Sequence, residues 1–160
     1  MKKKLSTLIA ILLVVALSFF ASPGEEAAPV TGETLLAAQI MDDGSTLITA
    51  DGIYTSKEDV SLYIHTYGIL PDNFITKDEA RKLGWEGGGL EPYAPGMCIG
   101  GDRFGNYEGL LPEDREYKEC DIDTLYADSR GAKRIVFSDD GLIYYTEDHY
   151  ESFELLYGEP

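Results

Sequence analysis

Two histidines are the residues best suited to moving a proton near neutral pH, because imidazole changes charge there. His149 lies in the segment Thr146-Glu147-Asp148-His149-Tyr150, between two strand-like patterns, which predicts a loop. Loops on a rigid scaffold often hold functional side chains. His65 lies in a helical pattern, where a surface or packing role is the simpler interpretation. His149 is therefore the candidate proton donor or acceptor, with an ordinary loop histidine as the alternative.

Glu119 is a second candidate for acid–base chemistry. Residues 117–123 alternate, so that Glu119 and Asp121 fall on one face of a predicted strand and Cys120 on the other. In an antiparallel sheet the polar face can be open to water or to a ligand. One more solvated acid among the 29 of this chain is the alternative interpretation of Glu119.

Three cations are candidates for binding an anion. Arg130 and Arg134 follow Glu119 in the sequence, and Lys77 opens a predicted helix. The planar guanidinium of arginine suits phosphate oxygens. Surface ion pairs are the alternative role for each of the three.

The overall charge limits which partners are possible. The 160 residues hold 13 Lys and Arg against 29 Asp and Glu, a formal net charge of −16. Binding to nucleic acid through bulk charge is excluded, because it requires a basic surface. Recognition of an anion therefore needs a local cationic pocket. Two cysteines and two histidines exclude a Cys-rich zinc module, and no metal or cofactor is expected.

The N-terminus predicts export. Lys2, Lys3 and Lys4 precede an apolar run over residues 8–20, which is short for a membrane span and typical of a signal peptide. We expect residues 1–24 to be this signal, with an uncleaved anchor as the alternative, and the protein to be secreted. Its removal leaves ten cations against 29 anions, a charge of −19.

The remaining chain divides into an acidic linker or pro-segment, residues 25–50, and one domain, residues 51–160. Within the linker a short helix is expected over residues 35–41. In an exported protein Cys98 and Cys120 are candidates for a disulfide, and two buried free thiols are the alternative.

The elements that must position the candidate residues are two helices followed by strands. Ser56 and Thr76 each open a capping box, with Pro71 expected to stop the first helix and Gly84 to close the second. Short strands are predicted over residues 99–104, 117–123, 134–138, 142–146 and 152–156. Helices first and antiparallel strands afterwards indicate an α+β fold, with the helices packed on a twisted antiparallel sheet.

Several motifs stand in one fixed order along residues 60–153. They are Leu70-Pro71-Asp72-Asn73-Phe74-Ile75-Thr76-Lys77, Leu83-Gly84-Trp85, Ile99-Gly100-Gly101-Asp102, Asn106, Glu108-Gly109, Glu119, Asp121-Ile122, Arg130, Arg134-Ile135, Leu142-Ile143-Tyr144 and Asp148-His149-Tyr150. In this order they resemble the barnase-like bacterial extracellular ribonucleases, which prefer guanine and cleave RNA without a metal. The resemblance covers essentially the whole predicted domain.

The resemblance implies a role for each candidate residue. Glu119 would be the general base for the ribose 2′-hydroxyl and His149 the general acid for the leaving 5′-oxygen, through a 2′,3′-cyclic phosphate. Lys77, Arg130 and Arg134 would stabilise charge on the phosphate. Asp121 would orient the arginines, and Arg115 with Asp140 would form a structural ion pair.

Guanine recognition would fall to the loop that runs from Phe104 through Gly105, Asn106 and Tyr107 to Glu108, with Tyr150 also contacting the substrate. Backbone N–H groups would donate to the guanine carbonyl, and the Glu108 carboxylate would accept from the Watson–Crick edge. Adenine lacks that pair of donors, so such a site discriminates against it.

The sequence departs from the family pattern at three places. Tyr107 replaces an arginine, and the segment Asn106-Tyr107-Glu108-Gly109 resembles fungal T1-type ribonucleases, where the tyrosine stacks on guanine. Gly105 replaces a serine, which is a minor change if only the backbone is used. The loop over residues 124–129 is one residue longer, which weakens the assignment of Arg130.

The expected partners are an RNA substrate and a barstar-like intracellular inhibitor, and the protein is expected to be a monomer that leaves the membrane after signal cleavage. A non-catalytic module that binds RNA or an inhibitor on the same fold is the alternative function.

Overall fold

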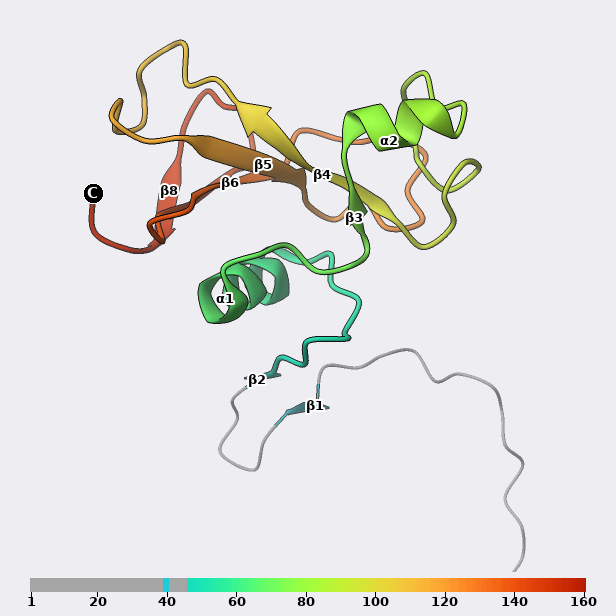
Figure 1. Ribbon diagram of the computed structural model, residues 1–160, viewed down its shortest axis with the longest axis horizontal. Coiled ribbons are helices and arrows are strands. Elements are labelled where there is room, and N and C mark those ends of the chain that lie inside the picture. Colours follow the sequence, from blue (N-terminus) through green and yellow to red (C-terminus); the bar gives the residue numbers. More distant parts are fainter. Residues whose placement is uncertain (1–38, 41–45) are drawn as a thin grey trace, which may run out of the picture. The chain divides into compact units, whose positions relative to one another are not determined.

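The computed structural model describes residues 39–40 and 46–160 (Figure 1). The expected signal peptide and most of the expected acidic segment lie outside the described residues. The elements are β1 (Gln39–Ile40), β2 (Thr46–Leu47), α1 (Lys57–Tyr67), β3 (Phe74–Ile75), α2 (Lys77–Lys82), β4 (Cys98–Phe104), β5 (Tyr117–Asp121), β6 (Arg134–Ser138), β7 (Ile143–Thr146) and β8 (Glu154–Tyr157). Neither helix in this described part of the chain has the length and apolarity needed to cross a bilayer.

Six strands form one sheet in the order β3-β4-β5-β6-β7-β8. Neighbouring strands are antiparallel except for β3 and β4, which are parallel. The register places Asp102 of β4 opposite Glu119 of β5, and Asp121 of β5 opposite Arg134 of β6. This register brings the charged candidates from three adjacent strands to one region of the sheet.

Helix α1 covers one face of the sheet (Figure 1). Ser56 caps its N-terminus, since the side chain accepts a hydrogen bond from the Asp59 N–H. The helix ends at Gly68, which adopts a left-handed conformation with φ of 72°. Buried side chains of α1 pack on β5, β6 and β7 in a core of Val60, Tyr63, Ile64, Cys120, Ile135, Phe137, Ile143 and Tyr145.

The opposite face of the sheet holds a second core and the charged candidates. Tyr117, Val136 and Tyr144 project to this face and pack with Leu111 and Leu142. Phe104, Tyr150 and Phe153 are partly buried against the same cluster. Glu119 lies between Tyr117 and Asp121 on its strand, and side chains alternate along a strand, so it shares this face.

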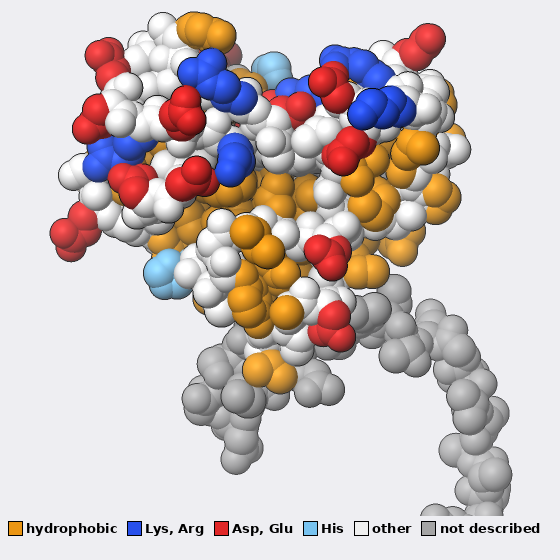
Figure 2. Space-filling model, viewed as in Figure 1, with side chains coloured by type: hydrophobic (Ala, Val, Ile, Leu, Met, Phe, Trp, Pro, Cys, Tyr) orange, Lys and Arg blue, Asp and Glu red, His pale blue; other side chains and the backbone are white. Residues whose placement is uncertain are grey.

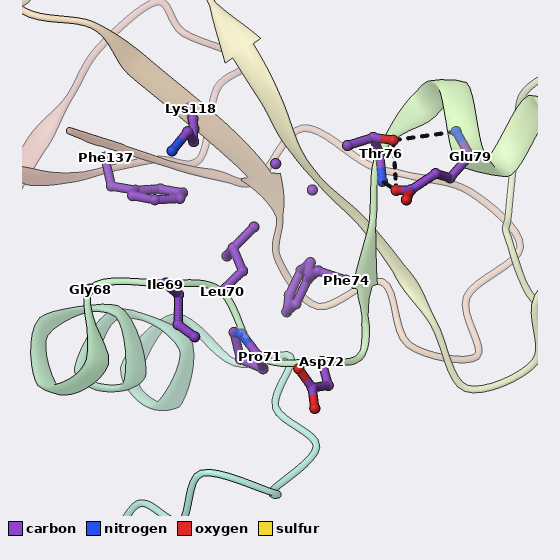
Figure 3. A pocket seen from close by; sticks show the side chains of 12 residues that line it. Gly68, Ile69, Leu70, Pro71, Asp72, Phe74, Thr76, Glu79, Lys118 and Phe137 are labelled. Atoms are coloured by element: carbon purple, nitrogen blue, oxygen red, sulfur yellow. Dashed lines mark hydrogen bonds between the residues drawn. The ribbon is translucent and has the colours of Figure 1, made fainter. Parts of the chain in front are cut away.

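Helix α2 is short and held at its N-terminus by a complete capping box. The Thr76 side chain accepts from the Glu79 N–H, and the Glu79 carboxylate accepts from the Thr76 N–H (Figure 3). Ala80 packs with Trp85, Leu90 and Ile99 in a third small core. This packing and the parallel β3–β4 pair attach α2 to β4 next to the charged region.

The α+β class, both helices and the five later strands are confirmed, with shifted ends for several strands. Three expectations are corrected. The first helix ends at Gly68 rather than through Pro71, because glycine takes the left-handed cap. Residues 39–40 pair with residues 46–47 as strands, where a helix was expected over 35–41. The parallel strand β3 was missed, since two residues are too short for a detectable alternation.

Cys98 and Cys120 are both buried free thiols, so the open choice is resolved in favour of two thiols in this structure. Burial raises the pKa of each thiol. Their positions on β4 and β5 place them in or beside the core under α1.

The buried Asn73 generates a stability prediction. Its amide oxygen accepts from the Tyr54 N–H at 3.2 Å, and its amide nitrogen donates to the Tyr54 carbonyl at 2.9 Å. Asn73→Ala leaves two buried backbone groups without these partners, so we expect a loss of about 2 kcal/mol or more in urea unfolding. Asp72→Ala, at the exposed neighbouring position, should change stability by less than about 0.5 kcal/mol. Equal effects of the two substitutions would contradict the assignment.

Candidate active site

Glu119 is the central charged group of the sheet face opposite α1. It is 7% exposed. The Lys77 ammonium donates to one carboxylate oxygen at 2.5 Å, and the Tyr150 hydroxyl donates to the other. Burying an ionised carboxylate is costly unless it is paired and hydrogen-bonded. Both oxygens of Glu119 have such a partner, one a lysine ammonium and the other a tyrosine hydroxyl.

The position of Lys77 follows from the capping of α2. Lys77 is the first residue of that helix, and its backbone N–H donates to the Asp102 carboxylate at 2.9 Å. Asp102 lies directly opposite Glu119 in the β4–β5 register. The Asp102 carboxylate therefore binds the backbone N–H of Lys77, and the Glu119 carboxylate binds its side-chain ammonium. About a quarter of the Lys77 side chain is exposed, so its ammonium can also be reached from solvent.

Asp121, two residues beyond Glu119, is 1% exposed and pairs with two arginines. Arg130 donates to both of its oxygens, at 2.7 and 2.8 Å, and this pairing raises the pKa of the guanidinium. The Nε of Arg134 lies 3.0 Å from the same carboxylate. A bidentate pair of this kind fixes the plane of the Arg130 guanidinium.

The two arginines differ in what they can reach. A quarter of the Arg130 side chain is exposed, whereas that of Arg134 is 2% exposed. Arg134 donates to the backbone carbonyls of Arg130, Gly131 and Lys133. Arg134 thus holds the loop from its buried side, whereas the Arg130 guanidinium is partly exposed at the surface.

The loop over residues 124–131 is docked on a glycine-rich loop. Gly89 donates its N–H to the Asp128 carbonyl at 2.8 Å, and a Cβ atom at Gly89 would lie 2.2 Å from the Ala127 carbonyl oxygen. Arg130 lies over the ring of Trp85, 5.9 Å from its centroid, and the Trp85 indole donates to the Gly88 carbonyl. Although this loop is one residue longer than in the family pattern, Arg130 still lies beside Asp121.

His149 lies on an exposed turn after β7 that has an unusual backbone. His149 and Tyr150 both have positive φ, 60° and 75°, which L-residues rarely adopt. Asp148 holds this turn by accepting from the Thr146 hydroxyl at 2.8 Å and from Ser152. These hydrogen bonds, led by the Ser152 hydroxyl, lower the pKa of Asp148 to about 2. Such strain is maintained only where the surroundings fix it, commonly at functional sites.

Tyr150 joins the parts of the site. Its hydroxyl donates to Glu119, its ring lies 4.8 Å from the His149 ring, and its ring lies 5.1 Å from Phe104 at the end of β4. Burial and the adjacent Glu119 carboxylate raise the pKa of Tyr150, so the hydroxyl stays a donor. The tyrosine therefore links Glu119, His149 and the loop that follows Phe104.

That loop is braced by Asn106, which has a φ of 46°. The Asn106 side chain accepts from the Leu111 N–H and donates to the Leu111 carbonyl, which closes the loop on itself. Tyr107 is 89% exposed, and its ring lies over Gly105, where a Cβ atom would come within 2.3 Å of the ring. Gly105 is therefore more than a minor change, because it leaves room for the Tyr107 ring.

The structure brings Lys77, Glu119, Tyr150 and His149 into one chain of contacts, with Arg130, Arg134 and Asp121 beside it. It confirms the expected Arg115–Asp140 ion pair, at 2.7 Å. Sequence reasoning gave no role to Trp85, and none to Asp102 beyond its place in a motif. Their contacts depend on loop docking and strand register, which local patterns do not encode.

A cavity of about 390 Å³ lies elsewhere, on the other side of the sheet (Figure 3). Leu70, Phe74 and Phe137 line it, with Lys118 at its edge. Lys118 precedes Glu119 on β5 and therefore faces away from it. Among the described residues no group of three or more His, Cys, Asp or Glu side chains could hold a metal ion.

Comparison with known proteins places the chain in a family. Residues 57–157 match the family model described as ribonuclease. The chain is 36% identical to a ribonuclease of Bacillus intermedius over 94% of this chain and 97% of that protein. It is 38% identical to a ribonuclease of Bacillus pumilus, over 96% and 98%. It is also 47% identical to guanyl-specific ribonuclease St of Saccharopolyspora erythraea, over 44% of this chain and 67% of that protein.

The Asp148 hydrogen bonds generate a pH prediction. The pKa of this carboxyl is lower in the folded chain than in the unfolded chain, so its stabilisation is complete above about pH 4 and disappears as the pH falls through about 2. Asp148→Asn should therefore lower the free energy of unfolding at pH 5, and its difference from the wild type should shrink toward pH 2.

Urea unfolding over this pH range measures the effect, with Glu151→Gln, an exposed acid on the same turn, as the matched control. A difference between the wild type and Asp148→Asn that is the same at pH 5 and pH 2 would show that the turn does not depend on the ionised Asp148.

Proposed function

The chain belongs to the ribonuclease family, and from that premise we propose that it is an exported endoribonuclease that cleaves single-stranded RNA on the 3′ side of guanosine without a metal. The observation that supports the proposal most strongly is the chain of contacts from Lys77 through Glu119 and Tyr150 to His149. A carboxylate and an imidazole that both contact the same tyrosine are suited to paired proton transfers.

In the proposed reaction the Glu119 carboxylate takes the proton of the ribose 2′-hydroxyl. The 2′-oxygen forms a bond to phosphorus, and the bond between phosphorus and the 5′-oxygen breaks. His149, as imidazolium, gives its proton to the leaving 5′-oxygen, which yields a 2′,3′-cyclic phosphate. In the second step His149 takes a proton from water, and Glu119 returns its proton to the 2′-oxygen as the ring opens to a 3′-phosphate.

The developing negative charge on the phosphate would be stabilised by the cations that solvent can reach. Lys77 and Arg130 each expose about a quarter of their side chains. Cations fixed before the reaction need no reorganisation during it, which is why such preorganised charges are effective. Arg134, which is buried, would hold the loop that carries Arg130, and its positive charge would also stabilise the phosphate.

Guanine would bind at the loop that starts at Phe104. The Asn106 brace keeps the loop backbone in one conformation, so its N–H groups can face the base. The exposed Glu108 carboxylate would accept from the guanine edge, and Tyr107 would stack on the base, worth about 1–3 kcal/mol. The guanyl-specific ribonuclease of Saccharopolyspora erythraea, a relative of this chain, supports the guanine preference.

Export rests on the N-terminal pattern, three lysines followed by a short apolar run. A secreted monomer, with a barstar-like inhibitor that protects the producing cell, stays part of the proposal. Tyr107 would stand at the surface that such an inhibitor has to cover.

The proposal is tested with purified protein in EDTA and an RNA oligonucleotide that holds one internal guanosine. We expect a single cut 3′ of that guanosine, with a 2′,3′-cyclic phosphate identified by mass spectrometry. Cleavage after every base would contradict the proposed role of this loop in guanine recognition. Intact RNA bound to folded protein would favour the alternative, a non-catalytic binding module on this fold.

The catalytic assignments are tested by His149→Ala and Glu119→Gln. Each should lower kcat/KM by about 100-fold or more, as loss of a positioned acid or base does. His65→Ala, the same change at the other histidine, should leave activity within about twofold of the wild type. Near-wild-type activity in both site variants would rule out the assigned acid and base.

Gly89 supplies a prediction away from the reacting groups. Gly89→Ala forces the backbone of residues 127–128 to shift, and Arg130 should move with it. We expect kcat/KM to fall by about 10- to 100-fold. Gly89→Ala should have little further effect on kcat/KM in an Arg130→Ala background.

Asp128→Ala is the control, because it keeps the backbone carbonyl that Gly89 contacts. If Gly89→Ala lowers kcat/KM as much in the Arg130→Ala background as in the wild type, Gly89 does not act by positioning Arg130.

A further inference from the structure

The cations of this chain are almost all engaged by its own carboxylates. Apart from Lys2, Lys3 and Lys4, the sequence holds ten Lys and Arg, all within the described residues. Eight of the ten form ion pairs, with N–O distances of 2.5 to 3.1 Å. Figure 2 accordingly shows blue and red side chains interspersed over the visible face. A flanking phosphate of RNA would have to compete with a carboxylate for each of these cations.

The two remaining cations, Lys82 and Arg103, have no carboxylate partner within 4 Å among the described residues, and both are placed away from the reacting groups. Arg103 pairs with Lys118 in the β4–β5 register, next to the Asp102–Glu119 pair. Neighbouring side chains on a strand point to opposite faces, so Arg103 projects from the face that α1 covers. Lys82 lies at the end of α2 that is remote from Lys77.

The surroundings of the site are acidic instead. Glu147 and Glu151 flank His149 on its turn, and both are exposed. At the guanine loop the exposed side chains are the Glu108 carboxylate and two large hydrophobic groups, Tyr107 at 89% and Leu110 at 54%. Glu113 reaches the same loop, with its carboxylate 3.2 Å from the position of a Cβ atom on Gly109. Phosphates on either side of the scissile one would meet negative charge or apolar surface.

We propose that this ribonuclease engages RNA through one guanosine and one phosphate only, so that a GpN dinucleotide is cleaved about as well as longer RNA. The inference rests on the proposed function, because it concerns the same site. Lys77 and Arg130 bind the scissile phosphate, and Tyr107 and the guanine loop bind the base. Glu113, Glu147 and Glu151, the acidic rim of the site, give flanking phosphates no favourable contact.

Salt dependence follows from the number of phosphates bound. For single-stranded nucleic acid the slope of log affinity against log salt is about −0.7 for each phosphate that is neutralised. One phosphate contact predicts a slope no steeper than about −0.7 for a long substrate as well as a short one. An enzyme that binds several phosphates would show a slope several times steeper.

The experiment compares GpA with an octanucleotide that holds one internal guanosine followed by adenosine, at 50 to 400 mM salt. We expect kcat/KM values within threefold of each other and equal, shallow salt slopes. An octanucleotide cleaved more than threefold better at 50 mM salt, with a steeper slope, overturns the inference. Failure to cleave either substrate instead overturns the proposed function.

Glu113→Lys tests whether the acidic rim sets this behaviour, with Glu159→Lys as the matched charge change beyond β8, three strands from β5. Glu113→Lys should raise kcat/KM for the octanucleotide about fivefold at 50 mM salt, steepen its salt slope by about 0.7, and leave GpA within twofold. An octanucleotide response no larger than that of Glu159→Lys overturns the inference.

Discussion

Two nearly buried carboxylates on one strand set the arrangement of this site. Glu119 and Asp121 lie two residues apart on β5, on the same face of the sheet. Ionised groups in such places are costly unless cations and donors surround them. Those partners come from three separate elements: Lys77 from the start of α2, Arg130 from the loop before β6, and Arg134 from β6 itself. The cations that would stabilise a phosphate are thus the cations that these acids require.

The same balance explains how an acidic protein can present a site for an anion. Each site cation is already paired, so the site is close to neutral before substrate binds. In the proposed function, a phosphate entering the site would share Lys77 with Glu119 and Arg130 with Asp121. The remaining surface, at a net charge of −16 for the whole chain, gives little long-range attraction for RNA. The proposed recognition of RNA would therefore rest on short-range contacts, namely base stacking on Tyr107 and hydrogen bonds from the loop that Asn106 braces.

Much of this fold could be predicted from the sequence because the local signals agree with it. The capping residues Ser56 and Thr76 open the two helices, and the alternation around Glu119 places it opposite the core under α1. The resemblance brought the site residues together before any contact was known. What could not be predicted depends on distant backbone: the Asp102 contact with Lys77 needs the β3–β4 and β4–β5 registers, and the fit of Gly89 needs the docked loop. The positive φ of His149 and Tyr150 has no sequence signature, since neither residue is glycine.

In the proposed reaction, Glu119 acts as an ionised base and His149 as a protonated acid. The pH dependence of kcat/KM for GpA in EDTA tests it most directly, measured for the wild type and for Glu119→Gln. We expect a bell-shaped profile for the wild type, whose acid limb is absent in Glu119→Gln while its alkaline limb remains. An acid limb that persists unchanged without the Glu119 carboxylate would mean that another group is the base.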